Sequence, residues 1–240
     1  MKKLFLIACI ISTSVLHGQQ FINSGQVEFE VRTNIHKVFG DGIWADMARE
    51  RFPQFSTNYY TFTFSNNKAV YHFDRNGDQQ KIPWGREKED DIWYNDYASG
   101  TYIDQKWVFD NTYLLTDSLL DIEWKLFPYE TRDIAGFNCR KAQAILFDSV
   151  YVFAFYTDEI TIPGGPMGLN GLPGMILGIT IPRMHTSWVA TKVSLNYDPK
   201  KITPPTKGKK RNTTDLLENV IKATKDWGNW GQQAVWGIFL

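Results

Sequence analysis

Histidines and clustered acids are the first residues to consider, because they could hold a metal ion in this 240-residue chain. His36, His72 and His185 each lack a second histidine or a cysteine at ligand spacing. The stretch DRNGD, residues 74–78, resembles the start of a calcium loop, but glutamine and glycine occupy the sixth and twelfth positions of that pattern. We therefore favour a hairpin at DRNGD and expect no metal ion and no other cofactor.

Nucleophilic and acid–base chemistry has few candidates. Cys139 lies in the strand-like stretch NCRKA, which favours a buried thiol, although Arg140 and Lys141 leave a nucleophile open. Asp158 and Glu159 are adjacent, so on a strand they would point to opposite faces and could not form a glycosidase pair. Motifs of a nucleophile elbow, a zinc protease and a phosphate loop are absent from the sequence. We predict no catalytic residues, and a hydrolase with a site assembled from distant residues is the third hypothesis.

The glycine-rich stretch GPMGLNGLPGMILGI, residues 165–179, is the most unusual pattern in the chain. A phosphate-binding glycine loop opens a helix, whereas this stretch opens an apolar run that predicts a strand. A type II turn fits better, with Pro173 at the second position and Gly174 at the third, where φ is positive. We expect this turn to present Leu172 and Met167 near a surface. The turn comprises Gly171, Leu172, Pro173 and Gly174.

Most of the chain has the period-two pattern of β-strands. In QVEFEVRT, for example, Val27, Phe29 and Val31 alternate with charged residues. Asn76-Gly77 predicts a two-residue hairpin turn. The fold class we expect is mainly β: one large, strongly curved antiparallel sheet, a half-barrel like the periplasmic lipoprotein carriers, with one or two short helices packed on it. The likeness to these carriers is an analogy.

Helices are few. Residues 43–52 predict a short helix, and residues 214–227 predict a clearer one in which Asp215 is the N-cap. Residues 198–213 are basic and proline-rich, so we expect an exposed loop there. Residues 19–240 are expected to form a single β-rich domain, since that length suits one large core.

The N-terminal residues 1–18 have the pattern of a secretory signal peptide, with a basic start and an apolar centre too short to span a membrane. A buried helix and a lipidated Cys9 are less favoured alternatives. The formal charge changes from 26 basic and 26 acidic residues to 24 and 26, or −2, once Lys2 and Lys3 are removed. That balance argues against nucleic-acid binding. The mature chain would keep Cys139 as its one cysteine and no transmembrane segment.

The chain resembles the GLPGLI family of exported Bacteroidetes proteins over roughly residues 120–180. Met175 stands in place of a leucine of the motif, and Phe155 stands where the family tends to have tryptophan. The resemblance implies a β-rich protein in the periplasm or at the outer membrane of a Gram-negative bacterium. It implies no function or catalytic residue, because the family is uncharacterised. The matching segments are GLPGMI at 171–176, IEWKL at 122–126, IAGFNCRKA at 134–142, FYTDEI at 155–160 and Gly165-Pro166.

The segment VYVFAFYT, residues 150–157, is apolar on both faces, whereas an open antiparallel sheet normally has one wet face. We therefore predict a binding protein whose concave face holds an apolar ligand, either a lipid tail or a segment of an envelope protein. The alternative is an accessory or assembly protein that binds another envelope or outer-membrane protein through the glycine turn and the sheet edge. C-terminal aromatic residues could instead fill the concave face. The residues expected to contact the ligand are Phe153, Phe155, Leu172 and Met175.

Overall fold

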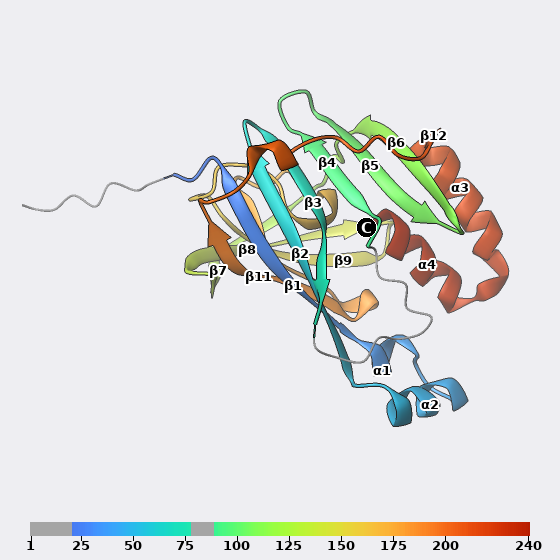
Figure 1. The fold of residues 1–240 in the computed structure, drawn as a ribbon. Coiled ribbons are helices and arrows are strands. Elements are labelled where there is room, and N and C mark those ends of the chain that lie inside the picture. The colour runs from blue at the N-terminus through green and yellow to red at the C-terminus, as the bar shows by residue number, and fades with distance from the viewer. Residues whose placement is uncertain (1–20, 78–88) are drawn as a thin grey trace, which may run out of the picture.

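The computed structural model describes residues 21–77 and 89–240, so the signal-peptide prediction for residues 1–18 lies outside it. Within these residues the strands form one 12-stranded sheet (Figure 1), in the order β12-β6-β5-β4-β3-β2-β1-β11-β10-β9-β8-β7. The prediction of a mainly β, mostly antiparallel fold is confirmed. The strands are β1 (Gly25–Asn34), β2 (Phe55–Ser65), β3 (Lys68–Asn76), β4 (Ile92–Asp96), β5 (Thr101–Val108), β6 (Asn111–Ser118), β7 (Lys125–Ile134), β8 (Phe137–Leu146), β9 (Val150–Thr157), β10 (Met175–Ile181), β11 (Thr186–Ser194) and β12 (Lys209–Arg211).

Short helices accompany the sheet. The predicted helix at 43–52 is α2, and the predicted helix at 214–227 is α3 continued by η4. Asn212, and not Asp215, caps α3: its side chain accepts the N–H groups of Thr214 and Asp215. The α-helices are α1 (Ile35–Val38), α2 (Ile43–Arg51), α3 (Thr213–Thr224) and α4 (Asn229–Phe239), and the 3-10 helices are η1 (Pro166–Gly168), η2 (Pro182–Met184), η3 (Pro199–Lys201) and η4 (Lys225–Trp227).

The sheet is open, with β7 and β12 at its edges, and it is not strongly curled. The predicted half-barrel is therefore wrong. Closure would require a continuous hydrogen-bond ladder between the two edges. β12 has only three residues, and β7 has a bulge at residues 127–131 that contains Pro128. Bulges and proline at an edge prevent further strand pairing.

One face of the sheet, which we call the inner face, carries the hydrophobic core, and we call the opposite face the outer face. The predicted alternation in β1 is confirmed, since Val27, Phe29 and Val31 are buried. They are joined on the inner face by cross-strand neighbours, with Val27 opposite Phe62 and Phe29 opposite Tyr60. Side chains of this kind stabilise a sheet through cross-strand contacts.

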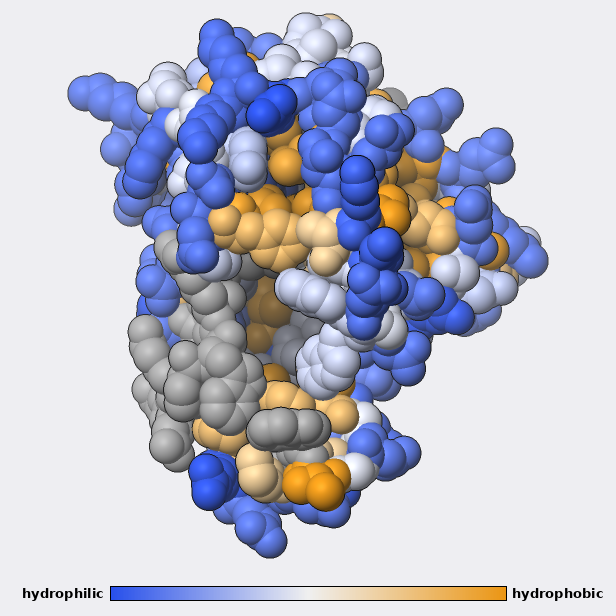
Figure 2. Space-filling view, turned by 90° about the vertical axis from the view of Figure 1, so that its right-hand side faces the viewer, coloured by the Kyte–Doolittle hydropathy of each residue, from blue (hydrophilic) through white to orange (hydrophobic). Residues whose placement is uncertain are grey.

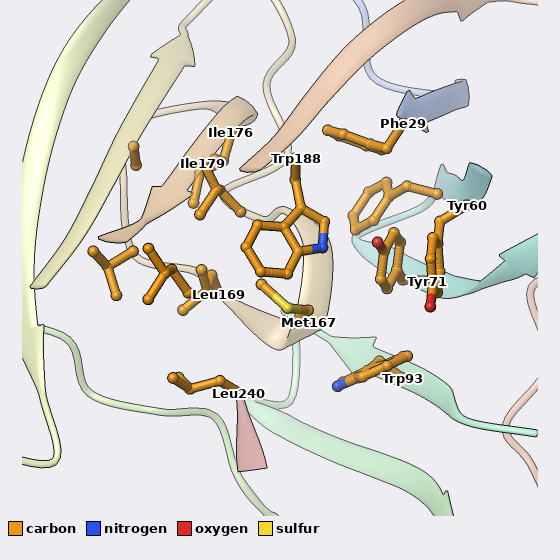
Figure 3. Packing of buried hydrophobic residues seen from close by; sticks show 14 of the residues in the cluster. Phe29, Tyr60, Tyr71, Trp93, Met167, Leu169, Ile176, Ile179, Trp188 and Leu240 are labelled. Carbon is orange, nitrogen blue, oxygen red and sulfur yellow. The ribbon is translucent and has the colours of Figure 1, made fainter. Parts of the chain in front are cut away.

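The glycine-rich loop, which we define as residues 158–174, connects β9 to β10 and covers part of the inner face. Its helix η1 packs against β3 and β4. In Figure 3, Met167 of this loop lies between Trp188 of β11 and Trp93 of β4. The expectation that the turn presents Leu172 and Met167 near a surface is wrong, because both side chains are buried. They cover apolar inner-face residues that would otherwise contact water.

The turn itself differs from type II. Gly174 has the predicted positive φ, at 127°. However, the N–H of Gly174 donates to the carbonyl of Leu172 at 2.8 Å, which closes a tighter turn around Pro173. The N–H of Met175 donates to the carbonyl of Ile160 instead, at 3.0 Å. The loop is therefore fastened to its own first residues as well as to the sheet.

The chain segments at the two ends of β3 differ. β2 and β3 are joined by a tight turn at Asn66 and Asn67, both of which have positive φ. The second strand of the predicted hairpin at Asn76-Gly77 would begin in residues 78–88, which lie outside the described residues; within them, β3 ends at Asn76 and its partner β4 begins at Ile92. The last residue of DRNGD, Asp78, lies outside the described residues.

The basic loop at residues 198–213 is mostly exposed, as predicted. It runs over the outer face of β3–β5 (Figure 1), where Pro204 and Pro205 share a groove with Val70 and His72. Pro205 is buried there. The loop ends in β12, which pairs with β6 in parallel. Because β12 lies at the edge of the sheet, α3 begins beside β6, from where it packs on the inner face.

We predict that Gly174→Ala destabilises the protein by about 1–3 kcal/mol or more. A positive φ alone costs a non-glycine residue this much, and a Cβ at Gly174 would also collide with the backbone carbonyl of Thr157. Gly136→Ala is the matched control, because Gly136 has φ of 88° and open space around its Cβ position. Urea unfolding measures both variants. Equal losses of unfolding free energy in the two variants would contradict a tight approach of the loop to β9.

Candidate functional site

A partly enclosed cavity of about 240 Å³ lies between the inner face of β4–β6, the glycine-rich loop and helices α3 and α4. Its wall is mainly apolar. In Figure 2, hydrophobic residues are also visible in a hollow on the side of the molecule that carries α3 and α4. The lining residues are Trp93, Asn95, Tyr102, Asp104, Lys106, Leu115, Leu119, Leu120, Leu146, Phe147, Met167, Gly168, Thr213, Leu217, Phe239 and Leu240.

The strand register brings polar side chains into this apolar wall. Asp104 lies opposite Trp93 of β4 and Leu115 of β6, both of which are inner-face residues. Because side chains alternate along a strand, Lys106 points to the same face as Asp104. The two side chains are almost fully buried: 9% of Asp104 and 3% of Lys106 remain exposed.

Asp104 is a buried carboxyl group with an incomplete set of hydrogen bonds. Its Oδ1 atom has no hydrogen-bond partner among the residues that the structure describes. Burial raises the pKa of Asp104 to about 7, while Lys106 and the N–H of Tyr94 lower it and the carboxylate of Asp91 raises it. The carboxyl group therefore changes its charge near neutral pH.

Lys106 is the cationic neighbour of this carboxyl group. Its Nζ atom lies 3.6 Å from the centroid of the Trp93 ring, a cation–π contact, and has no hydrogen-bond partner within residues 21–77 and 89–240. Burial lowers the pKa of Lys106, and the negative charges of Asp91 and Asp104 raise it in part. The ammonium group therefore has N–H donors without a partner in the described residues, in a side chain that lines the cavity.

The cavity wall also contains the polar residues Asn95, Tyr102 and Thr213, and a further tyrosine, Tyr97, contacts the glycine-rich loop. Tyr102 lines the cavity, and its hydroxyl group shares a hydrogen bond of 2.7 Å with the hydroxyl group of Thr213. The Tyr97 hydroxyl group is buried against Gly164 of the glycine-rich loop and lacks a partner in the described part of the chain. Burial raises the pKa of Tyr102 to about 12 and raises that of Tyr97 further above its ordinary value. Both phenols are therefore neutral near pH 7.

The arrangement combines an apolar wall with one carboxyl group and one ammonium group that lack partners. It can bind a ligand that has both apolar and polar parts. It could also transfer protons, because the pKa of Asp104 is close to neutral pH. Within the described residues, no group of three or more histidine, cysteine, aspartate or glutamate side chains is placed to hold a metal ion.

The structure does not bring the predicted contact residues together at this cavity. Phe153 and Phe155 lie on the outer face of β9, whereas its residues Val152 and Ala154 are buried in the inner core. Phe155 packs instead beside Gly178 of β10. The sequence pattern showed that both faces of β9 are apolar, but it could not show which face is inner.

The other predicted contact residues are part of the core. Leu172 and Met175 are completely or almost completely buried, and neither lines the cavity. Gly171 and Pro173 position them within the glycine-rich loop and at the start of β10. The predicted structural role of the turn residues is therefore consistent with their placement, and the cavity lies on the side of η1 that faces β4.

Asp104, Lys106 and Trp93 were not recognised as site residues from the sequence. In the segment TYIDQKWVF, Ile103 and Trp107 alternate with Asp104 and Lys106, so ordinary hydrophobic patterning places the charged pair in solvent. The structure has the opposite orientation. A signal does exist in the segment: two opposite charges at i and i+2 share a strand face with Tyr102 and Val108.

Other candidates have simpler roles. The prediction of a buried Cys139 thiol is confirmed, and burial raises its pKa to about 12.

On the outer face, Tyr151 stacks with Phe153 at a centroid distance of 6.4 Å, and Tyr151 is 47% exposed. None of the helices in the described residues is long and apolar enough to cross a membrane.

Comparisons with known proteins support the fold alone. No family model matches the chain, and no curated protein matches it significantly. The solved structure of PNGF-II is similar, with a TM-score of 0.54 and 13% sequence identity over 84% of this chain. The matched region is 34% of PNGF-II, so this chain spans about a third of that protein. An uncharacterised conserved protein from Thermus thermophilus has a TM-score of 0.37 and 6% identity, over 79% of this chain and 91% of its own.

We predict that the free energy of unfolding decreases as the pH rises from about 4 to about 7, and that Asp104→Asn removes much of this decrease. The pKa of Asp104 is raised from 3.8 in the unfolded chain to about 7 in the folded chain. Its contribution is therefore fully present below the unfolded pKa and is lost as the pH passes the folded value. The largest expected effect is about 4 kcal/mol.

Denaturant unfolding of both proteins across this pH range measures the difference. Asp91, Lys106, Tyr97 and Tyr102, which surround Asp104, are present in both proteins. The difference between the two pH profiles therefore isolates Asp104. Parallel profiles for the wild-type protein and Asp104→Asn would show that the carboxyl group ionises normally.

Proposed function

We propose that this chain binds a small ligand with an apolar body and a polar head in the cavity between β4–β6, the glycine-rich loop and helices α3 and α4. One observation carries the proposal. The mainly apolar wall contains two buried polar atoms, Asp104 Oδ1 and Lys106 Nζ, without a partner in the described residues. Buried polar groups are nearly always hydrogen-bonded, so exceptions in a cavity point to a missing partner.

The size of the cavity limits the ligand. A volume of about 240 Å³ is below the roughly 300–1,000 Å³ of pockets for drug-sized molecules. A long lipid chain could therefore not be enclosed completely. The proposal keeps the apolar-ligand class expected from the sequence, but it narrows the bound part to a short apolar segment with its head group.

The cellular setting is a separate part of the proposal. The pattern of residues 1–18 supports export, and the segments within residues 120–180 support a GLPGLI-like envelope protein. An exported binding protein could hold either a free small molecule or the apolar end of a larger envelope component. Both fit a cavity that is only partly enclosed.

We predict that hexan-1-ol binds saturably at one site, with a dissociation constant of roughly 0.1–1 mM. Burial of its six carbon atoms contributes at most about 5 kcal/mol. Leu217→Trp should abolish binding, because Leu217 of α3 lines the cavity and the larger ring would fill it. Isothermal titration calorimetry measures the affinity, and a rise in melting temperature with ligand concentration checks it.

The matched control is Leu195→Trp, which makes the same substitution at a leucine that is 67% exposed and does not line the cavity. This variant should bind as the wild-type protein does. Circular dichroism confirms that both variants are folded. Failure of the folded wild-type protein to bind hexan-1-ol, or equal binding by folded Leu217→Trp, would refute the cavity as a ligand site.

A second candidate function is ester hydrolysis in the same cavity, which would be the predicted long-range-assembled hydrolytic site. The observation that favours it is a pKa of about 7 for Asp104, which suits a general base near neutral pH. As a carboxylate, Asp104 would take a proton from water while that water attacks the ester carbonyl group. The tetrahedral intermediate would then collapse with cleavage of the ester C–O bond, and the leaving oxygen would depart as the alcohol with the proton held by Asp104. Lys106 Nζ, also in the cavity wall, could donate to the carbonyl oxygen.

We predict for this candidate that p-nitrophenyl hexanoate is hydrolysed at a rate that rises with pH through about 7. Asp104→Asn should reduce the rate at least 100-fold, the usual scale of general-base catalysis. Asp226→Asn is the control, since Asp226 is an exposed acid of η4 that does not line the cavity. A rate that is the same in the wild-type protein and Asp104→Asn would rule out this role.

A further inference from the structure

The polar head of the ligand can be specified further from the charges around the cavity, on the premise that the proposed binding site is correct. Asp104 and Lys106 lie two residues apart on one face of β5, and both line the cavity. One side of Lys106 Nζ is occupied by the Trp93 ring at 3.6 Å. Its remaining N–H donors and the Oδ1 atom of Asp104 are therefore the groups that a ligand head can reach.

The charges of the described residues at this point do not favour an anion. Two carboxyl groups, Asp91 and Asp104, act on a single ammonium group, Lys106. With all three ionised the sum is −1, and with Asp104 protonated it is zero. Tyr97 and Tyr102 stay neutral near pH 7. A carboxylate or phosphate head would bring a further negative charge into a buried site that has no positive charge left to balance it.

A cationic head meets a different obstacle. An ammonium group that reached Asp104 would also lie near the charge of Lys106, because both residues line the same small cavity and their charges act on each other. Two ammonium groups at short range in a poorly solvated cavity repel each other. Moreover, a primary ammonium group has no acceptor, so Lys106 would remain without a hydrogen-bond partner.

We propose that the ligand head is a neutral group that both donates and accepts hydrogen bonds, such as a primary amide or a hydroxyl group. Its oxygen accepts from Lys106 Nζ, and its N–H or O–H donates to Asp104 Oδ1. Each of the two partnerless atoms then has a partner, and the charge of the site is unchanged. The apolar body of the ligand extends along the leucines of β6 and α3 that line the cavity, Leu115 and Leu217.

The test is a matched series of ligands with six-carbon bodies: hexanamide, hexan-1-ol, hexanoate and hexylammonium, titrated into the full chain at pH 7.5. We expect hexanamide and hexan-1-ol to bind at least tenfold more tightly than hexanoate and hexylammonium. Tighter or equal binding of hexanoate or hexylammonium would overturn the neutral-head assignment. Absence of binding by all four would instead refute the cavity itself, so the two failures are distinguishable.

Charge-changing variants test the cause of the selectivity. Asp104→Asn removes one negative charge from the cavity with little change in volume, so hexanoate should bind this variant at least tenfold more tightly than it binds the wild-type protein. Asp226→Asn, at an exposed acid of η4 that does not line the cavity, should leave all four affinities unchanged. If folded Asp104→Asn keeps the wild-type ratio of hexanamide to hexanoate affinity, the charge argument is wrong.

A variant of the cation gives the complementary result. Lys106→Met keeps an unbranched apolar side chain beside Trp93 but removes the N–H donors. Hexanamide should bind this variant at least fivefold more weakly, and hexanoate should not gain affinity. A gain for hexanoate in folded Lys106→Met would show that the anion was excluded for a reason other than charge, and it would overturn the proposed partner of Lys106.

Discussion

The close approach of the glycine-rich loop to the sheet is the constraint on which the rest of the structure depends. A Cβ at Gly165 would come within 2.7 Å of the Ile176 side chain, and one at Gly174 would meet the backbone carbonyl of Thr157. Only residues without a side chain let the loop lie this close to β9 and β10. The loop can then place Met167 and Leu169 on the inner face, where both are buried. An apolar sheet face is thus covered by a loop instead of a second sheet.

The cavity exists because the glycine-rich loop does not cover the inner face of β5 and β6. The loop extends from β10 to β4, and the chain passes around the outer face before α3 and α4 cover the inner face of β5 and β6. Two separate pieces of chain therefore meet over β4–β6. Trp124, just before β7, also holds the loop in place by donating its indole N–H to the carbonyl of Asn170 at 2.8 Å. The loop is consequently held by this hydrogen bond and by the one between Met175 and Ile160.

The sequence predicted the strands better than it predicted their relationships. Period-two patterns identified the strands because the inner face of β1 requires residues such as Val27 and Phe29 to be apolar. The same patterns failed at Phe153 and Phe155, where both faces of β9 are apolar and the identity of the inner face depends on distant cover. They failed at Asp104 and Lys106 for the same reason, since these side chains face inward only because of the pairing of β5 with β4 and β6. The sequence also could not predict that the sheet is open. Openness depends on which strands lie at the edges, and the pattern of a single strand does not identify an edge.

Asp104 and Lys106 are difficult to explain as elements of stability. A charged group that is buried without good hydrogen bonds costs several kcal/mol, and apolar residues of similar size often stabilise a core more than an ion pair does. Most neighbours of the pair on the inner face are apolar, and Leu115 lies directly opposite Asp104. A leucine at position 104 would therefore continue the wall and strengthen the fold. The presence of a carboxyl group there, beside an ammonium group with unused donors, is better explained by a molecule that enters the cavity and completes their hydrogen bonds. On the proposal that a ligand occupies the cavity, stability and recognition make opposite demands on β5.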